Sequence, residues 1–457
     1  MTSPLTQLYA EFVGNIRPHA IPEEAKSVAR LGFTDCAGVI LAGRGEDVVR
    51  RVAQFVMSQG ARPVSRLALG VERASVINAG LVGGTASHAL DYDDFAFSNH
   101  PSAVLVPAIL AAADPNGADG ARMAAAYVAG YEVWADVMLR ERDLFYDRGW
   151  HPTAVLGPLG AAAAASVVLG LDVAQSRNAL ALAASDSGGV FENFGTMAKP
   201  WHGGRTAAAG LSAAYLAAAG LQASPTALEG HRGLLRALSP NGNVDLDTPP
   251  RLGDVWRSAS MRLNIKKYPV VGAAQRGIDA VLGLLRTQPV DPRRVRGIEA
   301  HISVRHAAVM PYHLPQDALQ AKFSLEFAIA SALVHGAVGF SELTDACVRN
   351  PFMQSLMQCV TIRTTEEFEP EWRDAAPFDI FHFTLDDGSV VSTPKVRRPK
   401  GHFDTPLSTE ELWAKFRGCA AHGHVGQSAA TALFEAMQGV DRLAGPQAIP
   451  IMDSERG

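Results

Sequence analysis

The uncharged stretch Pro152-Thr-Ala-Val-Leu-Gly-Pro-Leu-Gly-Ala-Ala-Ala-Ala-Ala-Ser-Val-Val-Leu-Gly-Leu171 decides the fold class. It is about as long as a membrane span, but it contains prolines and is dominated by small residues, which insert weakly into a bilayer. Helices rich in Ala and Gly approach each other closely, so the stretch predicts a tightly packed interior helix. A second uncharged run, 206–228, has the same character. Both runs predict a large helical bundle.

Helical patterning extends on both sides of this stretch. From Ile21 to about Leu221, apolar residues recur at spacings of three and four, as on one face of a helix. Cap-forming residues predict helix boundaries at Pro22, Gly43, Asp119 and Asp172. The cluster of Asn, Gly, Asp and Pro at 239–250 predicts a long loop.

The pattern changes after this loop. Residues 296–304 and 358–364 alternate apolar and polar side chains as half-buried strands do. Residues 378–385 and 389–393 flank the turn Asp386-Asp387-Gly388 and predict a hairpin. Helical patterning over 318–336 lies between the strands, so we expect a small α+β domain over 261–404. Ser408-Thr-Glu-Glu411 is a capping-box start for helices that reach about Leu443 and should pack on the first domain.

Composition limits the class of protein. A chain of 457 residues with 47% hydrophobic and 19% charged residues is long enough for two or three domains and is not disordered. Its 41 basic and 46 acidic residues give no polybasic surface, so we expect no nucleic-acid partner. The four cysteines are scattered without zinc or redox spacing, and the amino terminus has no signal pattern. We therefore expect a cytoplasmic protein with no membrane partner.

The first candidate site is His88-Ala-Leu-Asp91-Tyr-Asp93-Asp94, followed by His100-Pro-Ser. Three carboxylates within four residues repel one another unless donors, a cation or solvent compensates them. The alternative is a capped helix end in an exposed loop. The strongly apolar runs on each side instead favour a position at an inner edge of the bundle.

The second candidate site is Trp150-His151-Pro-Thr. A lone histidine beside an apolar run is more often a satisfied core residue than a catalyst. His100-Pro and His151-Pro, however, both place an imidazole just before a helix, whose first turn offers N–H groups to carboxylate ligands.

Two basic segments complete the set. Asn193 to Arg205 resembles an anion cradle, with Lys199, His202, Arg205 and flexible glycines before a helix; it lacks the ending of a Walker loop. The alternative is a basic surface loop. The second segment, Lys266-Lys267-Tyr268-Pro269, is a candidate binding site or a solvated strand end.

This inventory suits removal of a proton next to a carboxylate. Cations bind the acid groups of a polyanionic substrate and spread its developing charge, while a neutral His or Lys acts as the base. That chemistry needs no cofactor.

At these residues the sequence resembles the MmgE/PrpD family, which includes 2-methylcitrate dehydratase, cis-aconitate decarboxylase and iminodisuccinate epimerase. The likeness extends over nearly the whole chain. Its motifs are His88-Ala-Leu-Asp-Tyr-Asp-Asp, His100-Pro-Ser, Trp150-His-Pro-Thr, Lys199-Pro-Trp-His-Gly-Gly-Arg, Lys-Tyr-Pro at Tyr268, Ile278-Asp-Ala and Ala321-Lys-Phe-Ser-Leu.

The resemblance implies a mainly α fold, with a large all-helical domain from both chain ends (1–260 and 405–457), an inserted α+β domain (261–404), a site at their junction and a homodimer. It places the family's active-site positions on Asp91, His100, His151, Lys199 and Lys266; we expect Asp93, His202, Arg205 and Tyr268 to bind substrate. Three positions depart from the family pattern: Gln275, Phe327 and Phe95. At the position of Phe95, other members commonly have Thr. Phe in place of polar residues would fit a smaller or less charged substrate.

The leading hypothesis is a cofactor-independent carbon–oxygen lyase of a di- or tricarboxylic acid, most like 2-methylcitrate dehydratase. In it, Lys199 and Lys266 hold carboxylates, His100 and His151 are the acid/base pair, and Asp91 orients a histidine or assists proton transfer. The alternatives within the family are a cis-aconitate-type decarboxylase and an epimerase of an iminodisuccinate-like dicarboxylate. From other classes, the alternatives are a hydrolase with His88, Asp91, Asp93 and His100 as metal ligands and a non-catalytic carboxylate-binding protein.

Overall fold

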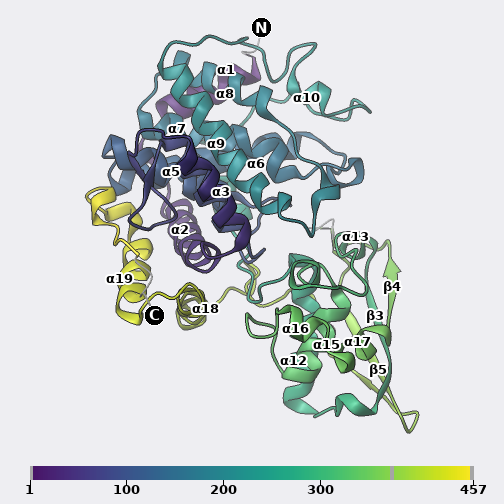
Figure 1. Ribbon diagram of the computed structural model, residues 1–457. Helices are drawn as coiled ribbons and strands as arrows, with labels where there is room; N and C mark the ends of the chain where they lie inside the picture. Colours follow the sequence, from purple (N-terminus) through teal and green to yellow (C-terminus); the bar gives the residue numbers. More distant parts are fainter. Residues whose placement is uncertain (1–3, 371–374, 453–457) are drawn as a thin grey trace. The chain divides into compact units, whose positions relative to one another are not determined.

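The computed structural model describes residues 4–370 and 375–452, which form two compact units (Figure 1). Within the described residues, the first unit takes 4–89, 93–263 and 409–452, and the second takes 90–92, 264–370 and 375–408. The sequence predicts boundaries at 260/261 and 404/405, whereas the chain changes unit after Leu263 and after Ser408. The short segment Leu90–Tyr92 also belongs to the second unit.

The first unit is a helical bundle with one short hairpin. Strands β1 (Ser65–Arg66) and β2 (Arg73–Ala74) pair antiparallel, so the prediction of an all-helical domain was wrong in this detail. Its helices are α1 (Leu5–Asn15), α2 (Glu23–Gly43), α3 (Asp47–Ser58), α4 (Val76–His88), α5 (Pro101–Asn116), α6 (Gly120–Arg140), α7 (Pro152–Leu169), α8 (Val173–Ala183), α9 (Ala198–Ala218), α10 (Leu234–Ala237), α11 (Arg257–Met261), α18 (Thr409–His422) and α19 (Gln427–Gln438).

Helix α7 lies at the centre of this bundle and contacts α5, α6, α8 and α9. Among the described residues it is the one helix long and apolar enough to cross a membrane, yet 89% of it is buried inside the protein. A helix that is apolar on all sides and buried is a core helix, as the sequence predicts. The second uncharged run is helical only as far as Ala218, after which the chain continues in turns.

Local signals set many of the helix boundaries. The Asp119 carboxylate accepts from the Arg122 backbone N–H at 2.8 Å, and Asp172 forms a capping box with Gln175. The predicted packing of the last helices is also confirmed, because α18 and α19 both contact α2. Gly43, however, is the last residue of α2 and not its left-handed cap. A Cβ there would overlap the carbonyl oxygen of Ala86, so this glycine permits close packing against α4.

The second unit is an α+β fold around a four-stranded sheet in the order β4-β3-β5-β6. Strands β3 and β4 are parallel, and the other two pairs are antiparallel. The predicted strands and Asp-Gly hairpin are confirmed; the predicted helix over 318–336 is broken, and Ser324 caps its second part. The elements are α12 (Gln275–Thr287), β3 (Val295–Ser303), α13 (Val304–Ala308), α14 (Ala318–Ala321), α15 (Leu325–His335), α16 (Asp345–Val348), α17 (Pro351–Gln358), β4 (Val360–Thr365), β5 (Ile380–Leu385) and β6 (Val390–Ser392).

Candidate active site

Three glycines allow helices α4 and α9 of the first unit to pack backbone against backbone. A Cβ at Gly84 would lie 2.8 Å from the Gly204 Cα, and one at Gly203 would lie 3.1 Å from the His88 Cβ. Gly203 and Gly204 stand inside α9 and not in a flexible loop, which corrects the predicted reason for their presence. This packing brings His88, the last residue of α4, against the first turns of α9.

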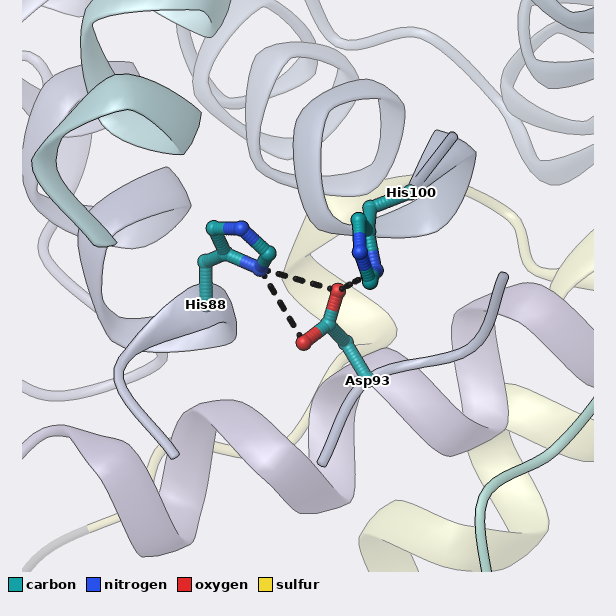
Figure 2. A group of neighbouring side chains, drawn as sticks. All are labelled: His88, Asp93 and His100. Atoms are coloured by element: carbon teal, nitrogen blue, oxygen red, sulfur yellow. Dashed lines mark hydrogen bonds and ion pairs between the residues drawn. The ribbon is translucent and has the colours of Figure 1, made fainter. Parts of the chain in front are cut away.

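A carboxylate on the α4–α5 connection lies between two imidazoles, as Figure 2 shows. The Nδ1 atom of His88 is 3.0 Å from Asp93 Oδ2 and 3.1 Å from Oδ1. The Nδ1 atom of His100, the residue before α5, is 2.8 Å from Asp93 Oδ2 and 3.1 Å from the Asp94 carbonyl oxygen. Because these oxygens accept hydrogen bonds, each Nδ1 carries the proton and each Nε2 is the basic nitrogen.

The three neighbouring carboxylates are compensated in three different ways, and all are at least 97% buried. Asp91 pairs with Lys266, whose Nζ is 3.0 Å from Oδ2, and Asp93 receives the two imidazoles. Burial, together with the nearby Asp35 charge, raises the pKa of Asp94 well above its usual range, which disfavours its charged form. The alternative of an exposed, capped helix end was therefore wrong.

His151, the residue before α7, pairs with His202 of α9. Their Nδ1 atoms are 3.2 Å apart, so one donates and the other accepts. The His151 ring lies 5.8 Å from that of His88 and 6.4 Å from that of His100 between centroids. The Thr153 hydroxyl accepts from the His100 backbone N–H at 3.1 Å, which links the two His-Pro helix starts directly.

The imidazoles are held neutral by burial and by nearby positive charge. Burial lowers the pKa of His88 to about 4 despite the opposing effect of Asp93. Burial lowers the pKa of His202 to about 4, with Arg205 adding to the effect. Burial and then Lys199 lower the pKa of His151 well below its ordinary value. The Nε2 atoms of His88 and His151 are buried and have no hydrogen-bond partner within residues 4–370 and 375–452.

Lys199 lies on the inner side of α9 and is 98% buried, which contradicts the alternative of a basic surface loop. Its Nζ is 5.0 Å from the centroid of the Phe194 ring, and that ring and the His151 ring pack in a T-shaped arrangement with centroids 4.9 Å apart. Trp201, on the opposite side of the helix, is 40% exposed. A buried ammonium group thus lies close to the imidazole cluster.

Arg205 holds the chain before α9 in place. Its guanidinium donates to the carbonyl oxygens of Gly188, of Asp186 at 3.1 Å and of Ala154 at 3.3 Å. These bonds fix the 186–188 segment against the first turn of α7. The predicted binding role of Arg205 stays a prediction, because its described hydrogen bonds are with backbone carbonyls and its guanidinium also lies over the Trp201 ring, 6.0 Å from the centroid.

In the second unit, Lys266 is 99% buried and donates to both the carbonyl oxygen (2.8 Å) and the carboxylate (3.0 Å) of Asp91. Asp91 has a φ of 50°, a left-handed conformation that Asp tolerates and that turns both acceptors toward the ammonium group. The Tyr268 hydroxyl donates to Asp279 at 2.8 Å. Binding roles for Lys266 and Tyr268 stay predictions of the resemblance.

Comparison with known proteins decides the family. The MmgE/PrpD N-terminal domain matches residues 7–247, and the MmgE/PrpD C-terminal domain matches 268–440. The chain belongs to the MmgE/PrpD family. Its relatives include the cis-aconitate decarboxylases of Mus musculus, 26% identical over 92% of this chain and 88% of the relative, and of Homo sapiens, 28% identical over 75% and 72%. The cis-aconitate decarboxylase-like protein oryM of Aspergillus oryzae is 27% identical over 75% of each chain.

Two of the three departures from the MmgE/PrpD pattern serve the packing of the second unit. The Gln275 amide accepts from the backbone N–H groups of Lys267 and Tyr268 at 3.1 Å each, and donates to the carbonyl oxygens of Tyr268 (2.9 Å) and Val270 (3.1 Å). It therefore uses its full hydrogen-bonding capacity to hold the segment that carries Lys266. Phe327 is completely buried in the core of the α+β unit. Phe95 is half-buried in the connection that carries Asp93.

The group that could hold a metal ion in this MmgE/PrpD member is His88, Asp93 and His100, whose ligand atoms lie within 4.8 Å of one another. Asp91, the fourth ligand of the hydrolase alternative, is paired with Lys266. A metal on the Nδ1 atoms would move each imidazole proton to Nε2. In His88 that N–H would be buried without an acceptor in the described part of the chain, whereas ligating histidines normally donate it. The three residues fit a doubly hydrogen-bonded carboxylate better than a metal.

The structure thus gathers five predicted residues in the first unit: Asp93, His100, His151, Lys199 and His202. Sequence reasoning assigned no role to Thr153 and Phe194, and named His88 only as a metal ligand in the hydrolase alternative. His88 stands five residues before Asp93, beyond one helical turn, and only the chain reversal after α4 brings them together. The spacing alone could not have predicted this contact.

Proposed function

We propose that this MmgE/PrpD member is a lyase that acts on a small di- or tricarboxylic acid by proton transfer at a carbon next to a carboxylate. The observation that carries the proposal is the buried cluster of neutral imidazoles beside the Lys199 ammonium group. An acid/base group and a cation in one water-poor site are the minimum equipment for this chemistry.

Each component has a separate task in the proposed reaction. Lys199 binds a substrate carboxylate, and its charge opposes the negative charge that develops when the neighbouring carbon changes its protonation state. Imidazoles that are neutral at physiological pH can accept a proton, and their conjugate acids can return it. Burial strengthens every one of these interactions, because the effective dielectric constant inside a protein is lower than that of water.

Decarboxylation of an unsaturated acid is the first candidate reaction, because the relatives named above are cis-aconitate decarboxylases or resemble them. In this step a C–CO2 bond breaks and its electron pair forms a new C=C bond. The original double bond takes up a proton at its far carbon, so one proton enters for each CO2 that leaves. The step requires an imidazolium donor and a cation for the carboxylates that stay.

Dehydration, as in a 2-methylcitrate dehydratase, is the second candidate. It requires one group that removes the proton next to a carboxylate and another that protonates the departing hydroxyl. His100 and His151 have different supporting groups, a carboxylate and an imidazole, which suits two such roles.

A substrate panel tests the proposal. We would incubate purified protein with cis-aconitate, 2-methylcitrate, citrate and iminodisuccinate in deuterated water, and follow CO2, product mass and chirality. Release of CO2 with one deuterium in the product supports decarboxylation, and an unsaturated product without CO2 supports dehydration. Deuterium in recovered substrate of inverted configuration would instead indicate an epimerase. Thermal stabilisation by an acid that is never converted would indicate a non-catalytic binding protein.

Two variants test the location of the chemistry. His151→Ala should lower turnover by about 10²–10⁴-fold while the protein remains folded, because it removes an acid/base group. His231 is exposed in the same unit, so His231→Ala is the matched control and should keep wild-type turnover. Near wild-type kinetics of folded His151→Ala would exclude a role for His151 in the reaction.

A further inference from the structure

The two His-Pro histidines differ in what lies behind each ring. The Nδ1 of His100 faces two oxygen acceptors, the Asp93 carboxylate at 2.8 Å and the Asp94 carbonyl at 3.1 Å. The Nδ1 of His151 faces another imidazole, that of His202, at 3.2 Å. A carboxylate behind an imidazole stabilises its protonated form, whereas a neutral imidazole supplies no negative charge.

Asp93 is itself fixed by a second ring. The His88 Nδ1 contacts both Asp93 oxygens, and the side chains of His88 and Asp93 have no exposed surface. The His100 side chain keeps 11% of its surface exposed, so it is the more accessible of the two rings that share this carboxylate. A carboxylate held between two N–H donors cannot turn away when one ring changes its protonation state.

We propose that Asp93 is a positioning residue that makes Nε2 of His100 the atom that exchanges a proton with the substrate, with His88 holding Asp93 in place. This inference rests on the proposed lyase function and says which histidine carries the proton. In dehydration, a C–H bond breaks and the N–H bond of the His100 imidazolium forms; the electron pair, spread toward the substrate carboxylate, forms the new C=C bond as the C–O bond breaks and the hydroxyl, protonated by a second group, leaves as water. In decarboxylation His100 first takes a proton from solvent; that N–H bond then breaks and a C–H bond forms as the C–CO2 bond breaks and CO2 leaves.

His151 then does not exchange the proton at carbon; its ring starts neutral and is left to hydrogen-bond the substrate or, in dehydration, to serve the departing hydroxyl. Its complete burial and then the Lys199 ammonium group disfavour a positive charge on it. Its pairing with His202 fixes which nitrogen donates without supplying a counter-charge. This arrangement also reassigns two predicted roles: Asp93, expected to bind substrate, orients a histidine, which was the role predicted for Asp91.

The first test needs no substrate. In protein labelled with ¹⁵N-histidine, the signal lost in His100→Gln identifies His100, and its shifts report which nitrogen is protonated. We expect a protonated Nδ1 and an unprotonated Nε2 at neutral pH. In Asp93→Asn, the amide NH2 can donate to Nδ1, so the proton should move to Nε2. A His100 already protonated at Nε2 in the wild type would overturn the inference, whatever the panel shows about the reaction.

The second test uses kinetics on whichever acid the panel identifies. Asp93→Asn should lower kcat by about 10²–10⁴-fold with little change in KM. Because the carboxylate no longer stabilises the His100 imidazolium, the pKa of His100 that appears in the pH profile of kcat should move to lower pH. Asp93→Glu restores the charge and should recover part of both effects. Asp114, whose carboxylate pairs with Arg66 at 2.9 Å, supplies the matched control: Asp114→Asn should change stability but not the pH profile. Equal pH profiles for Asp93→Asn and the wild type would refute the positioning role.

Discussion

Replacing Gly204 with alanine should damage the site without touching any of its polar groups. Gly204 lies in α9 where this helix crosses α4, and an added Cβ would overlap the Leu81 carbonyl oxygen and the Thr85 hydroxyl and lie 2.9 Å from the Thr85 nitrogen. Two of these atoms belong to the α4 backbone and cannot rotate away. The helices must therefore separate, and the first turns of α9 must shift relative to His88.

The size of the effect follows from this overlap. An ordinary carbon–oxygen contact is about 3.3 Å or longer, so relief requires a separation of about 1 Å. Overpacking of this kind lowers the free energy of unfolding by about 1–3 kcal/mol, while the higher helix propensity of Ala relative to Gly raises it by about 1 kcal/mol. A displacement of about 1 Å between reacting groups lowers the rate by roughly 100-fold. We therefore expect lower stability together with a large loss of kcat.

A graded set of Gly→Ala variants isolates the cause. Gly418 lies in α18, is exposed, and has nothing within 4 Å of a built Cβ, so Gly418→Ala should stabilise the protein and leave activity unchanged. Gly84→Ala, with its nearest contact at 2.8 Å, should fall between the two. Thermal unfolding and turnover would be measured for all three. If Gly204→Ala matched Gly418→Ala in both assays, the role of close helix packing would be refuted.

Three further predictions concern charges in the first unit. Lys415→Met should lower the free energy of unfolding by about 3–5 kcal/mol, because it leaves the Asp35 carboxylate, 2.6 Å away, buried without its cation. The double variant Lys415→Met with Asp35→Asn should recover much of this stability, as measured by chemical denaturation. Lys199→Met should weaken substrate binding and raise the pKa of His151, because it removes a nearby positive charge. NMR titration of His151 would detect the shift, and an unchanged pKa would contradict this prediction. Acid should destabilise the fold below pH 6.5, because the native pKa of His88 is about 4 and the unfolded chain binds this proton first. The free energy of unfolding should fall by about 2 kcal/mol at pH 5 from this group alone. In unfolding experiments over a series of pH values, stability should fall less steeply with acid in His88→Gln than in the wild type.

Local signals in the sequence predicted much of the fold correctly. Asp119 and Asp172 start helices because their side chains cap nearby backbone N–H groups, and Gly388, with a φ of 82°, permits the tight turn between β5 and β6. Such features depend on residues a few positions apart. The break before Ser324 was missed because the apolar pattern continues through it, although Ser324 is itself a good cap.

The sequence predicted the residue types of the site better than it predicted which of these residues contact each other. Residues before helices, such as His100 and His151, could be recognised because Pro marks the first helical position. The choice between Asp91 and Asp93 could not be made from spacing, because it depends on which way each carboxylate turns in a folded loop. The left-handed backbone at Asp91 directs that side chain to Lys266 instead.

The glycines of α9 show the same limit. A Lys-Pro-Trp-His-Gly-Gly-Arg segment can be a flexible loop or a helix packed closely on another, and both readings fit the sequence. The structure selects the helix, because Gly84 of α4 meets Gly204 at a distance that admits no side chain. Contacts between residues more than 100 positions apart carry no local signal.

The most direct test of the central claim is the rate at which solvent deuterium enters a carbon–hydrogen bond during turnover. With an acid that the panel shows to lose CO2, the wild type should incorporate one deuterium per turnover. With an acid that is dehydrated, the assay would start from the unsaturated product, whose hydration adds one deuterium per turnover. His100→Asn should lower that rate by about 10²–10⁴-fold, while His231→Asn should not change it. Deuterium incorporation at the wild-type rate by folded His100→Asn would contradict the proposal that this buried imidazole transfers the proton.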